Sequence, residues 1–188
     1  ADSAPPQVLD LSKNHFELFG LPAVFSVDLV QLAERYRSLQ KTLHPDRFAA
    51  AGDRERRLSL QASTRVNEAY RTLRDPLSRA QYLLALHTGE VGGRNETTRD
   101  TAFLMEQMEL REALSAAKDE TDACGAVGVV LDRLGELSRT LTGALGDCLD
   151  EPTAERLAQA RDLVVKLQFV EKCRVEAEQL EADLSDAL

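Results

Sequence analysis

The chain has 188 residues, of which 43% are hydrophobic and 29% charged, so its composition allows one large globular domain or two small ones. Its formal net charge of −9 argues against general nucleic-acid binding, because that function needs a basic face to displace counterions from phosphates. No apolar run reaches the length of a membrane span and no basic-then-apolar leader opens the chain, so the sequence predicts a cytoplasmic protein without a membrane partner.

The first half of the chain predicts a series of helices separated by clear breaks. Residues 1–14 are polar and are expected to form a loose lead-in, followed by a short apolar turn over 15–21. Apolar residues at helical spacing then predict a helix over 28–43, which must end there because Pro45 disfavours helical geometry in the residue before it. A second long helix is expected over 53–74, and a shorter one over 76–87.

The second half predicts three long helices and differs from the first in charge. Residues 88–96 contain three glycines and read as a linker, after which helices are expected at about 99–118, 121–149 and 153–186. Residues 1–87 hold 12 basic and 10 acidic residues, whereas residues 88–188 hold 11 and 22. A nearly neutral part joined to a strongly acidic part indicates two units with different partners.

The cysteines do not predict a metal site. Cys124, Cys148 and Cys173 are widely spaced and have no histidine close to them. This pattern is typical of small apolar residues on helices rather than of a zinc site or a disulfide framework. We therefore expect no metal and no cofactor.

A polar tripeptide between the first two long helices is a candidate recognition site. Pro45 restricts its own φ to about −65°, so His44 and Asp46 have little conformational entropy left to lose on binding. Basic residues lie on the solvent face of the preceding helix and directly after the tripeptide. The candidate site consists of His44, Pro45, Asp46, Arg37, Lys41 and Arg47.

Two other interpretations fit the same tripeptide. His-Pro and Pro-Asp are ordinary turn chemistry, so the loop could be structural only. Asp46 could also orient His44 as a general base in a helical enzyme. No nucleophile, set of metal ligands or Gly-rich loop accompanies the pair, so the sequence favours a protein that is not an enzyme.

Residues 15–87 resemble a J-domain. The matching segments are HFELFGLP, then RYRSLQKTLHPDRF with His-Pro-Asp in the loop, then NEAYRTLRDPLSRAQYLL. The resemblance implies that the six candidate residues dock on an HscA/DnaK-class chaperone ATPase and stimulate its ATP hydrolysis. It also implies that the core of this domain contains Leu32, Tyr36, Leu39, Val66 and Tyr70.

The helix expected at 99–118 has two apolar faces. At about 100° per residue, Phe103, Leu110, Leu114 and Ala117 fall in one narrow sector, which is the natural core face. The nearly opposite side carries Met105, Met108, Glu109 and Glu112, with Leu104 at its edge. An apolar patch with an acidic rim is typical of a binding surface, although a second packed helix could equally cover it. Phe169 lies off the apolar stripe of the last helix, either as another exposed anchor or packed against the middle helix.

The second half resembles the C-terminal three-helix domain of HscB, a J-domain co-chaperone of iron–sulfur cluster assembly. The segments that carry this likeness are RDTAFLMEQMELRE, VVKLQFVEKCR and EAEQLEADL. It implies binding of an IscU-type iron–sulfur scaffold protein. The residues matching the contact surface are Leu104, Met105, Met108, Glu109, Glu112 and Phe169. The chain departs from the family at Ala116, where the pattern has another acidic contact.

The expected fold is all-α, with an N-terminal J-domain helical hairpin and a C-terminal three-helix bundle. The expected organisation is a lead-in at 1–14, a J-domain at 15–87, a linker at 88–96 and a scaffold-binding domain at 97–188. The expected function is to deliver the scaffold to the chaperone ATPase. The alternatives are a J-domain co-chaperone with a different client, a helical enzyme using His44 and Asp46, and a purely structural helical adaptor.

Overall fold

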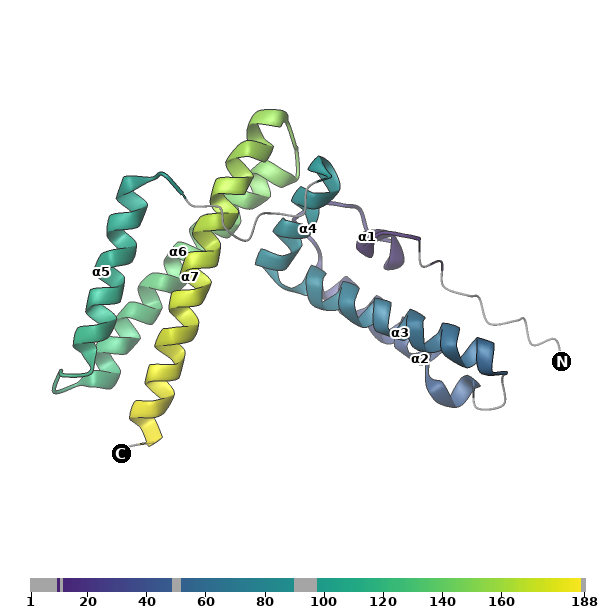
Figure 1. Ribbon diagram of the computed structural model, residues 1–188, viewed down its shortest axis with the longest axis horizontal. Coiled ribbons are helices and arrows are strands. Elements are labelled where there is room, and N and C mark those ends of the chain that lie inside the picture. The colour runs from purple at the N-terminus through teal and green to yellow at the C-terminus, as the bar shows by residue number, and fades with distance from the viewer. Residues whose placement is uncertain (1–9, 11, 49–51, 90–97, 187–188) are drawn as a thin grey trace. The chain divides into compact units, whose positions relative to one another are not determined.

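The computed structural model describes residues 10, 12–48, 52–89 and 98–186 (Figure 1). Over these ranges the chain forms seven α-helices and one 3₁₀ turn and contains no strand, as the sequence predicts. It divides into two compact units between Leu83 and Leu84. Most of the expected lead-in and residues 90–96 of the expected linker lie outside the described residues, so the predicted domain boundaries stay predictions.

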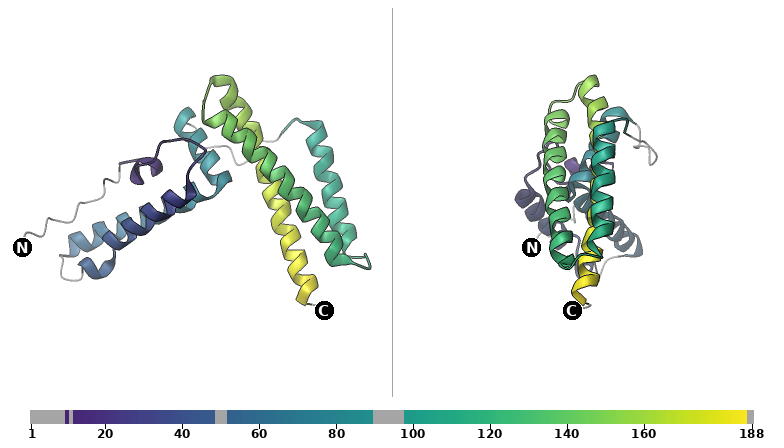
Figure 2. Two further views of the ribbon diagram at one scale, coloured as in Figure 1. Left: turned by 180° about the vertical axis from the view of Figure 1, so that it is seen from behind. Right: turned by 90° about the vertical axis from the view of Figure 1, so that its left-hand side faces the viewer.

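The first unit is a helical hairpin with a short helix before it. Its elements are α1 (His15–Leu18), α2 (Leu29–Thr42), the 3₁₀ turn η1 (Pro45–Phe48), α3 (Asp53–Arg74) and most of α4 (Pro76–Thr88). The two long helices, α2 and α3, lie side by side in the views of Figures 1 and 2. The loop between them therefore lies at the tip of the hairpin.

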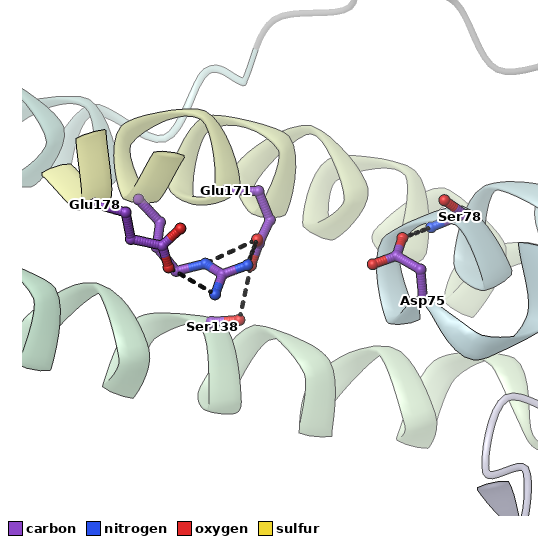
Figure 3. Close-up of polar contacts among 6 residues, drawn as sticks. Asp75, Ser78, Ser138, Glu171 and Glu178 are labelled. Carbon is purple, nitrogen blue, oxygen red and sulfur yellow. Dashed lines mark hydrogen bonds and ion pairs between the residues drawn. The ribbon is translucent and has the colours of Figure 1, made fainter. Parts of the chain in front are cut away.

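Local side-chain bonds explain where these helices begin. The Asp28 carboxylate accepts the amide protons of Val30 and Gln31 at 2.9 and 3.1 Å, which satisfies two free donors at the start of α2. The Asp75 carboxylate accepts the amide proton of Ser78 at 2.7 Å in the same way (Figure 3). Because Asp75 also ends α3, the chain starts α4 after a single-residue break.

The core of the first unit agrees only in part with the sequence. Leu32 and Val66 are fully buried, as expected. Tyr36, Leu39 and Tyr70 are half-buried instead. The two tyrosine rings stack at 3.9 Å across the open edge of the hairpin, so each ring packs on the other rather than inside the core.

An arginine connects the loop after α1 to α2. Arg35 donates from Nη1 to the carbonyl oxygens of Phe19 and Gly20 at 2.5 and 2.6 Å. Gly20 has a φ of +60°, a left-handed conformation that glycine adopts without a Cβ clash. The resulting sharp turn ends the short helix α1 and brings both carbonyl groups within reach of the guanidinium.

A buried histidine lies between α1 and α4. The His15 ring stacks on Tyr82 with 4.2 Å between ring centroids, and the His15 amide donates to the Tyr82 hydroxyl at 3.0 Å. His15 is only 4% exposed, and its Nδ1 atom has no hydrogen-bond partner. Burial, together with the nearby charge of Arg65, lowers the pKa of His15 below its ordinary value of 6.5, although Glu68 opposes the shift.

We therefore expect His15 to make the protein less stable in mild acid. The unfolded chain binds the proton more tightly than the folded chain, so stability is full above pH 6.5 and decreases as the pH falls toward the lowered pKa. Urea unfolding at pH 7.5 and 5.5 measures this loss. His15→Phe keeps a ring on Tyr82 and should lose less stability between the two pH values than the wild type, whereas the exposed-site control His87→Gln should match the wild type. Equal pH dependence in wild type and His15→Phe would rule out this role.

The second unit is a three-helix bundle. It contains α5 (Thr101–Ala117), α6 (Ala123–Leu149) and α7 (Ala154–Asp186), together with the end of α4. The two longest helices, α6 and α7, run side by side in both figures, and α5 packs against each of them. Ser138 on α6 donates to the Glu171 carboxylate on α7 at 3.1 Å, one of the polar contacts between these helices (Figure 3).

Apolar residues from all three helices form the core of the bundle. Leu134, Leu145 and Leu167 have at most 1% of their surface exposed. Cys148 and Cys173 are also buried, and burial raises the pKa of each thiol, which keeps it protonated and unreactive.

The described residues contain neither a candidate membrane span nor a candidate metal site. No helix there combines the length and the apolar character that a membrane span requires. The same part of the chain holds no group of three or more His, Cys, Asp or Glu residues placed to bind a metal ion.

Candidate functional site

The first candidate site lies at the tip of the α2–α3 hairpin. The Ser59 hydroxyl on α3 donates to the Leu43 carbonyl at 3.2 Å, which ties the end of α2 to the facing helix. Phe48, at the end of η1, is buried, so both ends of the tip are fixed by α3. The tripeptide that starts at His44 is therefore held between two anchored residues.

His44 and Asp46 are displayed at this tip rather than enclosed. Their side chains are 59% and 91% exposed, and His44 Nδ1 lies 3.5 Å from Asp46 Oδ2. The same Nδ1 atom also accepts the Asp46 amide proton at 3.3 Å. A pair this accessible to water lacks the desolvated surroundings on which electrostatic catalysis depends, but both side chains can reach a partner protein.

The basic residues of this site divide into two groups. Arg37 and Lys41 are four residues apart on α2, and both are exposed, so they form a positive strip that leads to the tip. Pro45 and Arg47 belong to η1, and the positions of their side chains lie outside the described part of the structure.

A polar cluster that the sequence did not predict fixes α2 against α3. The Tyr36 hydroxyl donates to the Asn67 side-chain carbonyl at 3.0 Å, and Gln40 donates to the same oxygen at 3.2 Å. Gln40 lies between Arg37 and Lys41 on α2, so this cluster determines the direction in which the positive strip faces. No local pattern marks these residues, because the partners are 27 to 31 positions apart in the sequence.

The second candidate site is the outer face of α5. The core face is buried as predicted and contains Phe103, Leu110, Leu114 and Ala117. On the opposite face, Met105 is 58% exposed, Met108 is 63% exposed and Leu104 is 39% exposed. No described helix covers the methionines, so of the two interpretations of this face, the structure favours the open one.

Phe169 lies on the neighbouring helix α7, which packs against α5. It is half-buried on α7, one turn after Lys166, whose amino group lies 5.6 Å from the Phe103 ring centroid on α5. The ring is therefore partly packed and partly available, between the two alternatives that the sequence left open. We refer to Leu104, Met105, Met108 and Phe169 as the apolar patch.

Carboxylates line one side of the apolar patch. Glu109 and Glu112 are exposed, and neither forms an ion pair with a described residue. Glu106, on the same helix, is by contrast paired with Arg133 of α6. Ala116 is exposed and uncharged, so the acidic contact that the family pattern has at this position is missing here.

Lys166 sets the register between α5 and α7 and thus the shape of the patch. Its Nζ lies 2.8 Å from the carboxylate of Asp100, which caps α5, and 2.9 Å from that of Asp162 on α7. These two bonds raise the pKa of Lys166 despite partial burial. The bond from Lys166 likewise lowers the pKa of Asp100.

We expect Lys166→Met to lower the free energy of unfolding by about 1–2 kcal/mol, because it removes two charge-assisted hydrogen bonds from a largely buried side chain. Urea unfolding followed by circular dichroism measures the change. Lys172→Met removes an exposed lysine of the same helix that has no described ion pair and should change the stability by less than about 0.5 kcal/mol. Equal midpoints for the two variants would contradict this role.

Comparison with known proteins places the chain in one family. Residues 99–178 match the family model described as the HSCB C-terminal oligomerisation domain. The co-chaperone protein HscB homolog of Burkholderia thailandensis is 46% identical over 169 residues, which are 90% of this chain and 94% of that protein. The homolog of Shewanella amazonensis is 40% identical over 173 residues, which are 92% and 99% of the two chains.

Solved structures give the same result. Chaperone HscB from Vibrio cholerae is 38% identical with a TM-score of 0.79, and the match covers 92% of this chain and 99% of that one. Human co-chaperone protein HscB is 30% identical with a TM-score of 0.81, over 90% and 83% of the two chains. These likenesses confirm the predicted fold of a J-domain and a C-terminal helical bundle.

The names of the relatives also define the general role. The curated relatives and the human structure are named co-chaperones, so the general role of the chain is that of a co-chaperone. Relatives at 40% and 46% identity match the chain over almost their entire length. The chain belongs to the HscB family of co-chaperones.

Proposed function

We propose that the protein binds an IscU-type iron–sulfur scaffold and delivers it to an HscA/DnaK-class chaperone, whose ATP hydrolysis it stimulates. The J-domain, expected at residues 15–87, contacts the chaperone through His44, Pro45, Asp46, Arg37, Lys41 and Arg47. The C-terminal domain, expected at residues 97–188, binds the scaffold through the apolar patch together with Glu109 and Glu112.

The observation that carries the proposal is the exposure of both methionines of the chain on one helix face. Met105 and Met108 are 58% and 63% exposed, although α5 has a complete apolar core face elsewhere. Exposing two large apolar side chains forgoes the stabilisation that their burial would give, and a partner recovers it by covering them. Their flexible thioethers suit a partner of irregular shape.

The chaperone-binding half rests on the tip of the hairpin. Asp46 is 91% exposed, and the loop that carries it is fixed at Leu43 and Phe48. An anchored loop loses little conformational entropy when it docks. The positive strip of Arg37 and Lys41 gives this docking surface a positive charge, which attracts a partner of negative charge at long range.

Carrying both sites on one chain provides the mechanism. Once the scaffold is bound to the bundle and the chaperone to the hairpin, the contact between scaffold and chaperone forms within one complex. The effective concentration of the scaffold at the chaperone therefore rises. The chain itself performs no chemistry in this scheme. Its contribution is to bring the client to the chaperone and to couple that step to ATP hydrolysis.

Isothermal titration calorimetry with each purified partner tests the proposal. The IscU-type scaffold and the ATP-bound HscA-type chaperone should each bind one protein molecule, and neither should displace the other. Competition between the two partners for one site would contradict the division between hairpin and bundle. Chaperone binding without scaffold binding would show a co-chaperone for a different client.

A further inference from the structure

Two exposed cations lie beside the apolar patch. Arg111 follows Met108 by three residues on α5, and Lys172 follows Phe169 by three residues on α7. Side chains three residues apart are neighbours on a helix surface, so each cation adjoins one patch residue. Neither cation forms an ion pair with any described residue.

Several cations of the bundle form ion pairs within it, whereas Arg139, like Arg111 and Lys172, forms none with a described residue. Arg133 pairs with Glu106 and Glu136, Lys166 pairs with Asp100 and Asp162, and Arg174 pairs with Glu171 and Glu178. These cations connect helices or brace a single helix. Arg111 and Lys172 do neither, although acidic residues outnumber basic ones by 22 to 11 over residues 88–188.

Arg111 lies on the side of α5 that faces α7. Burial raises the pKa of the Cys173 thiol of α7, Glu176 raises it further, and the charge of Arg111 opposes the shift. Glu176 is exposed in the same seam, and no ion pair joins it to Arg111 in the described structure.

The two signs of charge occupy different sides of the patch. At about 100° per residue, Arg111 lies about 60° from Met108 toward α7, whereas Glu112 and Glu109 lie about 40° and 100° from it in the opposite direction. Lys172 is exposed on α7 three residues after Phe169 and one turn before the exposed Glu176. The patch therefore has an acidic edge on α5 and a basic edge that consists of Arg111 and Lys172.

We propose that the basic edge binds carboxylate side chains of the IscU-type scaffold and fixes the orientation in which the scaffold docks. This inference rests on the proposed function. An apolar patch alone allows a partner to bind in several rotations, because the hydrophobic effect has no direction. Opposite charges on the two sides of the patch favour one orientation of the bound partner. They penalise the reverse orientation, because it places like charges together.

The basic edge also has a kinetic role. The bundle is acidic overall, so it repels an acidic surface at long range. Cations at the edge of the patch replace this repulsion by attraction at the position where the partner binds. Charges at the rim of an interface act mainly on the association rate and on its salt dependence, so these are the quantities to measure.

The test compares charge reversals by stopped-flow association of the full chain with the purified IscU-type scaffold. Arg111→Glu and Lys172→Glu should each slow association about tenfold and weaken binding at 0.1 M salt. The matched control is Arg139→Glu, which makes the same change of charge at an exposed position of α6 without a described ion pair. It should change the association rate by less than about twofold. The conservative variants Arg111→Lys and Lys172→Arg should bind like the wild type.

The possible outcomes are distinct. A larger effect of the two reversals than of the control, shrinking as salt is raised to 0.5 M, supports the basic edge. Reversals that associate like Arg139→Glu overturn the inference and leave the proposed function standing. Absence of scaffold binding by the wild type overturns the proposed function and the inference together. Circular dichroism verifies that each variant is folded. If Arg111→Glu does not fold, Arg111→Gln replaces it and should slow association in the same direction by a smaller factor.

Discussion

Asp46→Asn should remove most of the stimulation of the chaperone ATPase and leave scaffold binding unchanged. The amide keeps the shape of the side chain but removes its negative charge, and at 91% exposure the carboxylate has almost no packing to lose. Hydrogen bonds to a charged group are worth about 1.5–3 kcal/mol, so stimulation should fall about ten- to a hundredfold. Single-turnover ATP hydrolysis by the chaperone measures the effect.

The control for this experiment removes another exposed charge from the hairpin. Asp53→Asn changes the first residue of α3, which is exposed and lies beyond the tip. It should stimulate like the wild type. If Asp46→Asn retained full stimulation while bound to the chaperone, the hairpin tip would not be the functional contact. If it also lost scaffold binding while folded, the two sites would not be independent.

Met105→Ala combined with Phe169→Ala should have the reverse effect. Each truncation removes an anchor from the apolar patch, at a cost of about 1–4 kcal/mol in scaffold binding for a true anchor. Stimulation of the chaperone ATPase in the absence of scaffold should be unchanged, because the hairpin is intact. Calorimetric titration with the scaffold measures the loss directly.

Val175→Ala is the matched control for the patch. Val175 is 60% exposed on α7, about as accessible as Met105, but it is not part of the patch. Its truncation should change scaffold affinity by less than about twofold. Equal losses from Val175→Ala and from the patch variants would mean that binding depends on general surface hydrophobicity. The proposed site would then be wrong.

The limits of the helices could be predicted because local chemistry sets them. Asp28 caps α2, Pro45 prevents its continuation, and Asp75 both ends α3 and caps α4. Each of these effects acts within a few residues and is visible in the sequence. The core face of α5 could be predicted for a related reason, since helical periodicity alone brings its apolar residues together.

Contacts between distant segments could not be predicted. Lys166 bridges Asp100 and Asp162, and Arg35 bonds to carbonyl groups after α1, yet each looks in the sequence like an ordinary surface charge. Tyr36 fits an apolar stripe but lies at the edge of the hairpin, where its ring stacks on a partner. Such outcomes depend on which helices become neighbours.

The candidate site, too, could be predicted only in part from the sequence. Periodicity placed Met105 and Met108 on one face, but it does not say how many neighbours a helix has. Only the packed bundle shows that this face is open. The proposed basic edge could not be predicted for the same reason, because Arg111 and Lys172 are 61 positions apart and lie on two helices, α5 and α7, that become neighbours only in the folded bundle.

Single-turnover ATP hydrolysis by an HscA-type chaperone tests the central claim most directly, with this protein and the IscU-type scaffold added separately and together. Delivery of a client predicts that the two together stimulate hydrolysis more than the sum of their separate effects, and that Asp46→Asn removes the gain. Stimulation by this protein that the scaffold does not increase would contradict the client. No stimulation by any combination would contradict the co-chaperone mechanism itself.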